Sequence, residues 1–180
     1  MIFPEIIFLL ILIIVLFFAV VFDIRFKRIP NWLTYPIMVS ATIYYTAING
    51  VAGFLFSTEG IVVGIAVLIV PYLLGGMGAG DAKLMGAVGG LLGPKGVFMA
   101  FLFTALIGGI YAIIVLVMHG FLKETLERYG IMLKNFFSTG KLIYMPPSEK
   151  ERRPKLRYGI AIAIGTLLSV FMKPEIMQFM

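Results

Sequence analysis

Two aspartates stand out as residues that could do chemistry. The chain contains only Asp23 and Asp81, and each lies where a long apolar run meets a basic or glycine-rich break. A carboxylate beside a membrane span is costly, so it usually has a function. Two carboxylates about 3 Å apart cannot both ionise easily and therefore share a proton. This pairing is typical of aspartyl peptidase chemistry.

Peptide hydrolysis by such a pair divides the work between the two side chains. One ionised aspartate takes a proton from water, and the protonated partner polarises the scissile carbonyl. Gly78 and Gly80 would permit positive φ and let a peptide backbone approach Asp81. Lys83, within one turn of Asp81, would tune that carboxylate or contact the substrate. Asp23 and Asp81 are the candidate catalytic residues, with Gly78, Gly80 and Lys83 in support.

Each aspartate also has a purely structural interpretation. Asp23 could form a surface ion pair with Arg25, Lys27 or Arg28 and so anchor the end of a span. Asp81 could be an acidic residue at a helix N-terminus, where the helix dipole favours negative charge. Position along the chain leaves these alternatives open.

The composition identifies a membrane protein. Hydrophobic residues make up 61% of the 180 residues and charged residues 13%, whereas soluble domains carry about 25% charged residues. The absence of cysteine excludes a disulfide, a thiol nucleophile and a cysteine-ligated metal. With His119 as the single histidine, a multi-histidine metal site is excluded as well. No metal-ligand spacing, phosphate loop or dinucleotide motif is present.

Apolar segments of about 20 residues are needed to cross a bilayer. The sequence predicts about six spans, at about 4–22, 33–49, 60–76, 82–93, 97–118 and 158–172. The first is expected to be a retained span, because no basic segment precedes it and no cleavage site follows it. The fourth is short and must extend back through Gly78 or lie against protein. Its glycines suit close contact with a neighbouring helix, namely Gly86, Gly89, Gly90 and Gly93. The prediction is an all-α, polytopic membrane domain covering residues 1–180.

The distribution of Lys and Arg predicts the orientation. With the N-terminus outside, thirteen of the fifteen basic residues face the cytoplasm, and only Lys95 and Lys173 lie outside. The net charge of +6 therefore indicates membrane orientation, and we expect no nucleic-acid partner. Both Asp23 and Asp81 are then placed at the cytoplasmic face, at the ends of the first and fourth spans.

Residues 119–157 are predicted to form a cytoplasmic loop. Apolar residues recur at helical spacing between 121 and 137, at Leu122, Leu126, Tyr129, Leu133 and Phe136. This pattern predicts an amphipathic helix, which would lie on the inner leaflet or pack on the bundle as a connection. The proline-rich segment 146–154 is expected to be a flexible tether.

Taken in order, these segments resemble the type IV prepilin peptidases. Residues 22–25 and 29–34 are similar to the first aspartate motif of that family, and 78–84 to its second, the GxGD motif. Residues 86–93 continue that pattern, and 157–165 resemble the motif of the last span. The resemblance implies an aspartic endopeptidase of the cytoplasmic (inner) membrane with Asp23 and Asp81 as the catalytic pair. It also implies a substrate, a type IV prepilin-like or preflagellin-like precursor whose short basic leader is removed, and no cofactor.

The chain departs from the long members of that family. Those enzymes carry an additional cytoplasmic segment, often with paired CxxC motifs, and also methylate the new N-terminus. Here Asp23 is followed by the second span after about ten residues, and cysteine is absent. These differences argue against N-methyltransferase activity. The short form resembles the peptidases of tight-adherence pilus systems or archaeal preflagellin peptidases.

Three alternative functions remain on the sequence alone. A presenilin-like enzyme cutting inside the bilayer would use the same GxGD motif, but its first aspartate lies deeper in a span. A small transporter could use two aspartates, although the chain shows no inverted repeat. A non-catalytic subunit of a secretion assembly is the third. Processing of a precursor would separate the last two from a peptidase.

Overall fold

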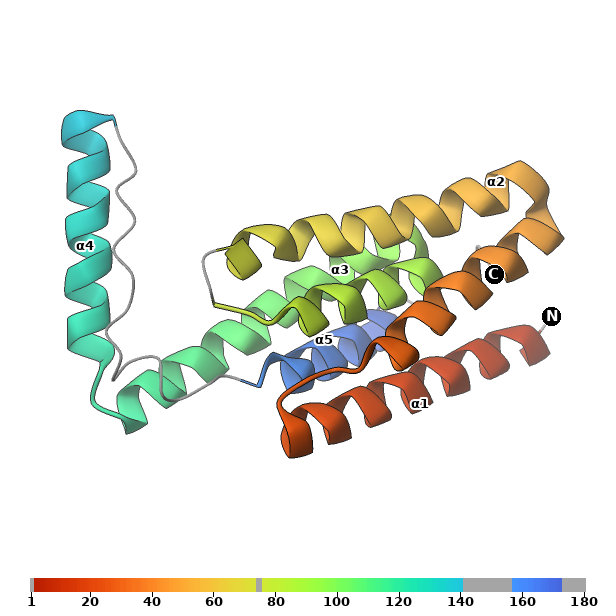
Figure 1. The fold of residues 1–180 in the computed structure, drawn as a ribbon, viewed down its shortest axis with the longest axis horizontal. Coiled ribbons are helices and arrows are strands. Elements are labelled where there is room, and N and C mark those ends of the chain that lie inside the picture. The colour runs from red at the N-terminus through yellow and green to blue at the C-terminus, as the bar shows by residue number, and fades with distance from the viewer. Residues whose placement is uncertain (1, 74–75, 141–156, 173–180) are drawn as a thin grey trace. The chain divides into compact units, whose positions relative to one another are not determined.

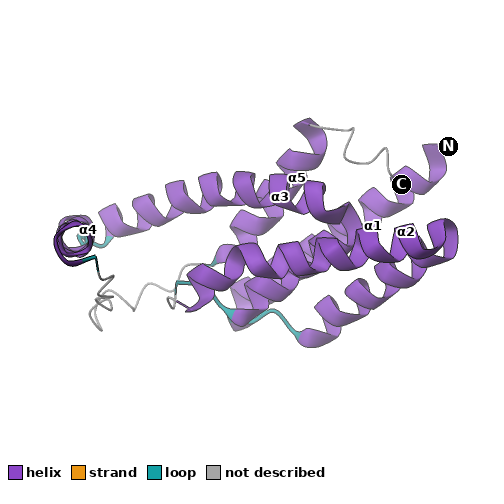
Figure 2. Ribbon diagram, turned by 90° about the horizontal axis from the view of Figure 1, so that it is seen from above, coloured by secondary structure: helices purple, strands orange, loops and turns teal. Residues whose placement is uncertain are grey.

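The computed structural model describes residues 2–73, 76–140 and 157–172, and all regular elements there are α-helices. The helices are α1 (Ile2–Phe26), α2 (Asn31–Leu73), α3 (Ala79–Met118), α4 (Leu122–Thr139) and α5 (Tyr158–Met172) (Figure 1). Figure 2 shows helices and short loops, with no strand in the part of the chain drawn in colour. The all-α prediction is confirmed for these residues.

Helix α2 is two helices joined by a turn at Gly50. The backbone of Gly50 is non-helical, with φ 59° and ψ −135°, a conformation that glycine adopts at low cost. The hydroxyls of Thr42 and Ser57 are 3.1 Å apart, whereas 15 residues of straight helix would separate them by about 22 Å. The chain therefore reverses at Gly50 (Figure 1). Residues 51–59, expected to connect two spans, are helical instead.

Helix α3 is interrupted in the same way at Gly93. Its φ of 70° and ψ of 179° are non-helical, and Pro94 follows, which suits the first position of a new helix. A Cβ on Gly93 would also overlap the ring of Phe56. This glycine makes a turn, and it also lies in the expected close helix contact, since a Cβ on Gly60 would lie 2.9 Å from Gly93 Cα.

The second half of α2 and the first half of α3 cross closely. A Cβ on Gly60 or Gly89 would overlap the carbonyl group of the other residue. A Cβ on Gly86 would lie 2.7 Å from Met38 Cε, and one on Gly90 would lie 3.2 Å from a side-chain carbon of Ile61. The expected role of these glycines in close helix contact is confirmed.

The structure divides into two compact units, Met1–Gly108 with Arg157–Met180, and Gly109–Leu156. In the first unit α1 packs against α5. A buried apolar core runs through it, with Leu16, Tyr45, Leu84 and Ile162 among its members.

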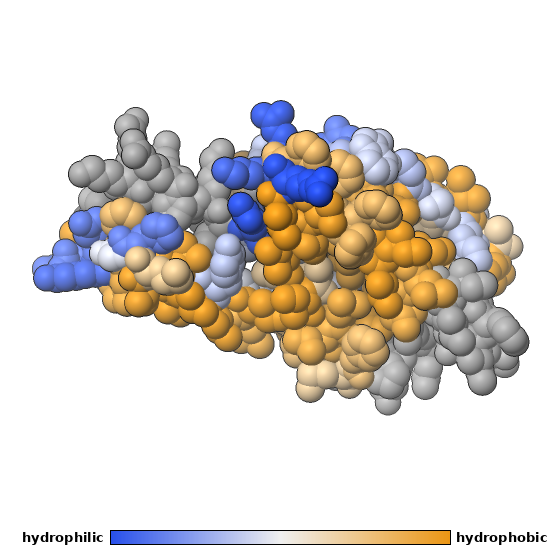
Figure 3. All heavy atoms as spheres, turned by 90° about the horizontal axis from the view of Figure 1, so that it is seen from below, coloured by the Kyte–Doolittle hydropathy of each residue, from blue (hydrophilic) through white to orange (hydrophobic). Residues whose placement is uncertain are grey.

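Many large side chains on the outside of the long helices are apolar, as one face shows in Figure 3. Among the described residues, Phe8–Phe26, Asn31–Leu73 and Ala79–Met118 are long and apolar enough to cross a membrane, and α5 is shorter. These surfaces are those expected of a membrane protein. The count of six spans, their orientation and the single-domain organisation stay predictions.

In the second unit, α4 confirms the helix expected between 121 and 137. Leu126 and Tyr129 lie on its apolar side and are more than half exposed. On its polar side Lys123 Nζ lies 3.9 Å from Glu127 Oε1. That α4 lies on a membrane or packs on protein stays a prediction. The predicted tether at 146–154 lies outside the described residues.

Candidate active site

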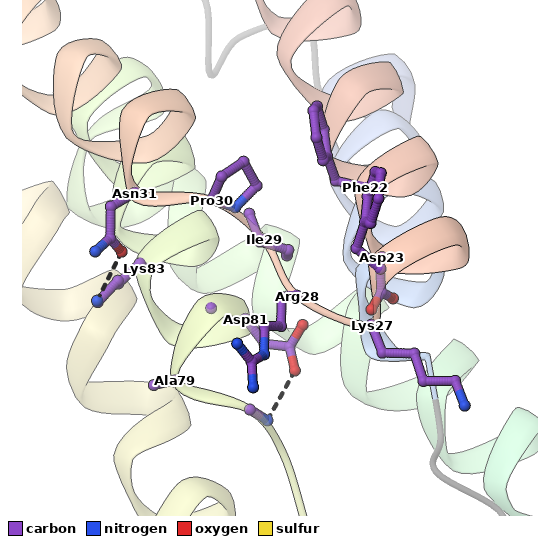
Figure 4. A pocket seen from close by; sticks show the side chains of 13 residues that line it. Phe22, Asp23, Lys27, Arg28, Ile29, Pro30, Asn31, Ala79, Asp81 and Lys83 are labelled. Carbon is purple, nitrogen blue, oxygen red and sulfur yellow. Dashed lines mark hydrogen bonds between the residues drawn. The ribbon is translucent and has the colours of Figure 1, made fainter.

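One pocket in the first unit contains both aspartates. It has a volume of about 620 Å³ and is lined by residues from 22–31, at the junction of α1 and α2, and from 78–83, at the start of α3. Figure 4 shows Asp23 on α1 and Asp81 at the start of α3 facing this pocket. They are close enough for the charge of Asp23 to act on Asp81. The structure thus brings together two residues 58 positions apart in the chain.

Asp23 lies in the last turn of α1 and is only 8% exposed. Its Oδ2 accepts a hydrogen bond of 3.0 Å from the backbone N–H of Gly159, in the first turn of α5. Arg157, just before α5, adds an attractive electrostatic interaction. The helix continues past Asp23 until Lys27, whose φ of 54° turns the chain toward α2. The predicted first span ends at about residue 22, whereas α1 extends to Phe26 and includes Asp23.

Asp81 is the third residue of α3 and is 7% exposed. Its Oδ2 accepts a hydrogen bond of 2.9 Å from the N–H of Gly78, and its own N–H donates to the Gly78 carbonyl at 3.1 Å. This reciprocal pair closes the turn that begins α3. The position also places the carboxylate at the positive end of the helix dipole. Asp81 therefore lies at a helix N-terminus, as the structural interpretation expected. It also lines the pocket, so the two interpretations are compatible.

The two glycines before Asp81 act differently from the expectation. Among the described glycines, positive φ occurs at Gly50, Gly93, Gly120 and Gly140, and at neither Gly78 nor Gly80. Instead, a Cβ on Gly80 would lie 3.1 Å from Ile29 Cβ and 3.2 Å from Ile29 N. The small residue lets the start of α3 lie against the loop between α1 and α2. Neither glycine uses the positive φ that its residue type permits, and the physical reason for Gly80 is close packing.

Lys83 lies at the rim of the pocket. Its Nζ donates a hydrogen bond of 2.9 Å to Asn31 Oδ1 and lies 5.3 Å from the ring centroid of Tyr35. Figure 4 shows the bond to Asn31. Lys83 makes no ion pair with Asp81. Because it bonds Asn31 instead, it links α3 to the start of α2. A role in tuning Asp81 or touching a substrate stays a prediction.

The ion-pair interpretation of Asp23 does not fit this geometry. Within the described part of the chain, neither aspartate has a basic group within 4 Å, and both carboxylates accept hydrogen bonds from backbone N–H groups. A buried carboxylate without a cationic group within ion-pair distance is unusual for a purely structural residue. The structural partner that the sequence did not reveal is Gly159. The sequence feature that could have indicated Gly159 is its place in 157–165, the segment similar to the last-span motif.

Comparison with known proteins supports the same region. The model of the type IV leader peptidase family matches residues 10–113, a segment that includes both aspartates and the whole pocket. A prepilin leader peptidase/N-methyltransferase from Bacillus subtilis (strain 168) is 34% identical over 119 residues. That match covers 61% of this chain and 43% of the Bacillus protein. No solved structure matches.

Proposed function

The chain belongs to the type IV leader peptidase family, and we propose that it is a membrane aspartyl endopeptidase with Asp23 and Asp81 as its catalytic pair. The observation that carries the proposal is that these two residues, the only aspartates in the chain, are buried in one pocket. Membership of the family implies aspartic peptidase chemistry. The assignment of the two residues to that chemistry rests on the resemblance of their motifs and on the pocket that they share.

The pair cleaves a peptide bond by moving protons between water, substrate and carboxyl groups. The ionised aspartate takes a proton from a water molecule, whose oxygen attacks the scissile carbonyl carbon. The other aspartate gives its proton to the carbonyl oxygen, producing a tetrahedral diol. The first aspartate then protonates the leaving nitrogen as the C–N bond breaks, and the second recovers a proton from the diol. Both carboxyl groups end as they began.

The backbone bonds to the aspartates support this division of work. In each residue a glycine N–H holds Oδ2, from Gly159 for Asp23 and from Gly78 for Asp81. Among the described residues, the hydrogen bonds to both carboxyl groups reach Oδ2, and we propose that Oδ1 of each faces water or substrate. Fixed side chains favour catalysis because the reacting groups need no rearrangement before reaction.

The substrate class follows from the family. We infer a type IV prepilin-like or preflagellin-like precursor, cut after its short basic leader at the cytoplasmic face of the inner membrane. The Bacillus relative is also named an N-methyltransferase, but this match covers 43% of it. This chain lacks cysteine, and we propose that it cleaves without methylating.

The test is cleavage of a precursor in a membrane. A prepilin-like precursor is co-expressed with the wild type, with Asp23→Asn or with Asp81→Asn, and the mature N-terminus is measured by mass spectrometry. The matched control is Glu59→Gln, which neutralises an exposed carboxylate of α2 outside the pocket. We expect cleavage by the wild type and the control, a loss of about 10³-fold or more with either Asp→Asn variant, and no added methyl group.

The outcomes separate the competing functions. If both Asp→Asn variants cleave like the wild type, the proposed pair is wrong. If no protein cleaves although each is inserted in the membrane, the transporter or assembly-subunit interpretation is favoured. A methylated product would contradict only the proposal that methyl transfer is absent.

A further inference from the structure

We propose that Gly159 is a positioning residue for Asp23, so that α5 is part of the catalytic apparatus. The inference rests on the proposed function and extends it to a residue outside the segment that the family model matches, 10–113. Gly159 does not touch the substrate. It acts through the carboxylate that it holds.

The contact between Gly159 and Asp23 is both a hydrogen bond and a steric fit. The N–H of Gly159 lies 3.0 Å from Asp23 Oδ2. A Cβ on Gly159 would lie 2.8 Å from that same oxygen, 3.0 Å from Asp23 Cβ and 3.1 Å from Cγ. Because all three atoms belong to the aspartate, any side chain at 159 must displace the carboxylate or the start of α5.

The hydrogen bond uses a donor that the helix itself leaves free. Gly159 is the second residue of α5, and the first four N–H groups of an α-helix have no partner inside it. The positive end of the helix dipole also favours a carboxylate at this place. The bond to Asp23 therefore costs α5 nothing.

The two aspartates differ in how their positions are secured. Gly78 precedes Asp81 by three residues, in the same turn, so that bond is local. Gly159 is 136 residues from Asp23, on another helix. The orientation of Asp23 thus depends on how α5 packs on α1, whereas that of Asp81 does not.

A competing explanation is that Gly159 serves only the packing of α5. Gly165 provides the comparison, because it lies on the same helix about 9 Å along its axis. A Cβ there would approach Thr104 at 2.5 Å, on α3, away from Asp23. A packing role predicts similar effects of substitution at both glycines, whereas positioning predicts an effect on catalysis at Gly159 only.

The experiment measures kcat, KM and thermal unfolding of the full chain in bilayer nanodiscs with a prepilin-like precursor. The variants are Gly159→Ala and Gly165→Ala. The benign control is Gly109→Ala, in a helix with nothing within 4 Å of the added Cβ. We expect Gly159→Ala to lower kcat at least about tenfold, since displacement by 1 Å can cost about 100-fold, with KM within about twofold. Gly165→Ala should lower the unfolding temperature and keep kcat within about threefold.

A second variant removes the donor without adding an atom. Replacing Gly159 with glycolic acid turns its amide into an ester, which lacks the N–H but has the same size. The matched control is the corresponding ester at Ile160, whose N–H also lies in the first turn and does not bond Asp23. We expect the ester at 159 to lower kcat about tenfold or more, as loss of a bond to a charged group does, and the ester at 160 to leave it within about threefold.

The inference and the proposed function fail in different ways. Wild-type kcat in the ester at 159, while Asp23→Asn is inactive, overturns the inference and leaves the proposed function standing. An equal loss of kcat in Gly165→Ala and Gly159→Ala also overturns it. Full activity of Asp23→Asn overturns the proposed function and the inference together.

Discussion

Replacing Gly80 with a larger residue should separate the start of α3 from the loop between α1 and α2. A Cβ on Gly80 would lie 3.1 Å from Ile29 Cβ, whereas carbon atoms in contact prefer about 3.5–4.0 Å. The two segments must therefore move apart by about 0.4 Å or slightly more. Since Asp81 follows Gly80 directly and Asp23 precedes the loop, this movement changes the relation between the two carboxyl groups.

The expected magnitude follows from that displacement. A misplacement of 1 Å can cost about 100-fold in rate, so about 0.4 Å should cost five- to tenfold in kcat for Gly80→Ala. Gly80→Val adds two more carbon atoms beside Ile29 and should cost about 100-fold or more. Stability should change little for Gly80→Ala, because alanine is favoured over glycine in a helix by about 1 kcal/mol, which offsets the poor contact.

The assay is single-turnover cleavage of a prepilin-like precursor in nanodiscs, with thermal unfolding measured on the same samples. Gly109→Ala is the control for a glycine-to-alanine change in open space. If Gly80→Val retained wild-type kcat and unfolding temperature, the argument that Ile29 sets the position of Asp81 would be refuted.

Three further variants test separate contacts. Tyr45→Phe removes a buried 2.7 Å hydrogen bond from the hydroxyl to a carbonyl of α3 and should lower the free energy of unfolding by about 1–2 kcal/mol, measured by denaturation in mixed micelles. Gly89→Ala forces α3 away from Gly60 and should cost about 1–3 kcal/mol by the same measurement. Lys83→Met removes the 2.9 Å bond to Asn31 and should lower kcat about two- to fivefold, in line with an exposed hydrogen bond of 0.5–1 kcal/mol.

For each of these three variants, one result would contradict the contact on which the prediction rests. An unchanged free energy of unfolding in Gly89→Ala would mean that the two helices are farther apart than the structure has them. A complete loss of cleavage in Lys83→Met would assign Lys83 to the reaction itself. No effect of Tyr45→Phe would mean that the carbonyl finds another donor.

The helices could be predicted from hydropathy, but their ends could not. Residues 51–59 interrupt the apolar pattern with Gly53, Ser57 and Glu59, which favoured a loop there. In the structure Ser57 bonds Thr42 and the carbonyl of Gly90, so its hydroxyl is satisfied inside the bundle and the helix continues. Gly50 alone makes the reversal, and a one-residue turn leaves no trace in a hydropathy average.

The two aspartates could also be predicted, whereas their partners could not. Asp23 and Asp81 are conspicuous because an apolar chain contains no other residue of their kind. The bond from Gly159 joins residues on helices far apart in the chain, and no local pattern specifies which helix ends meet. For the same reason the sequence does not reveal the contact of Gly80 with Ile29.

The pocket is built where helix ends meet, and this explains how an apolar bundle holds two carboxylates. The helices α2, α3 and α5 begin beside it, at Asn31, near Asp81 and near Gly159. Helix N-termini offer unpaired N–H groups and partial positive charge. In the described residues these groups replace a Lys or Arg partner within ion-pair distance of the aspartates. An ion pair would hold its carboxylate in the charged form, which suits an anchor. Neutral N–H donors also favour the charged form, but they orient the carboxylate without placing a full opposite charge beside it.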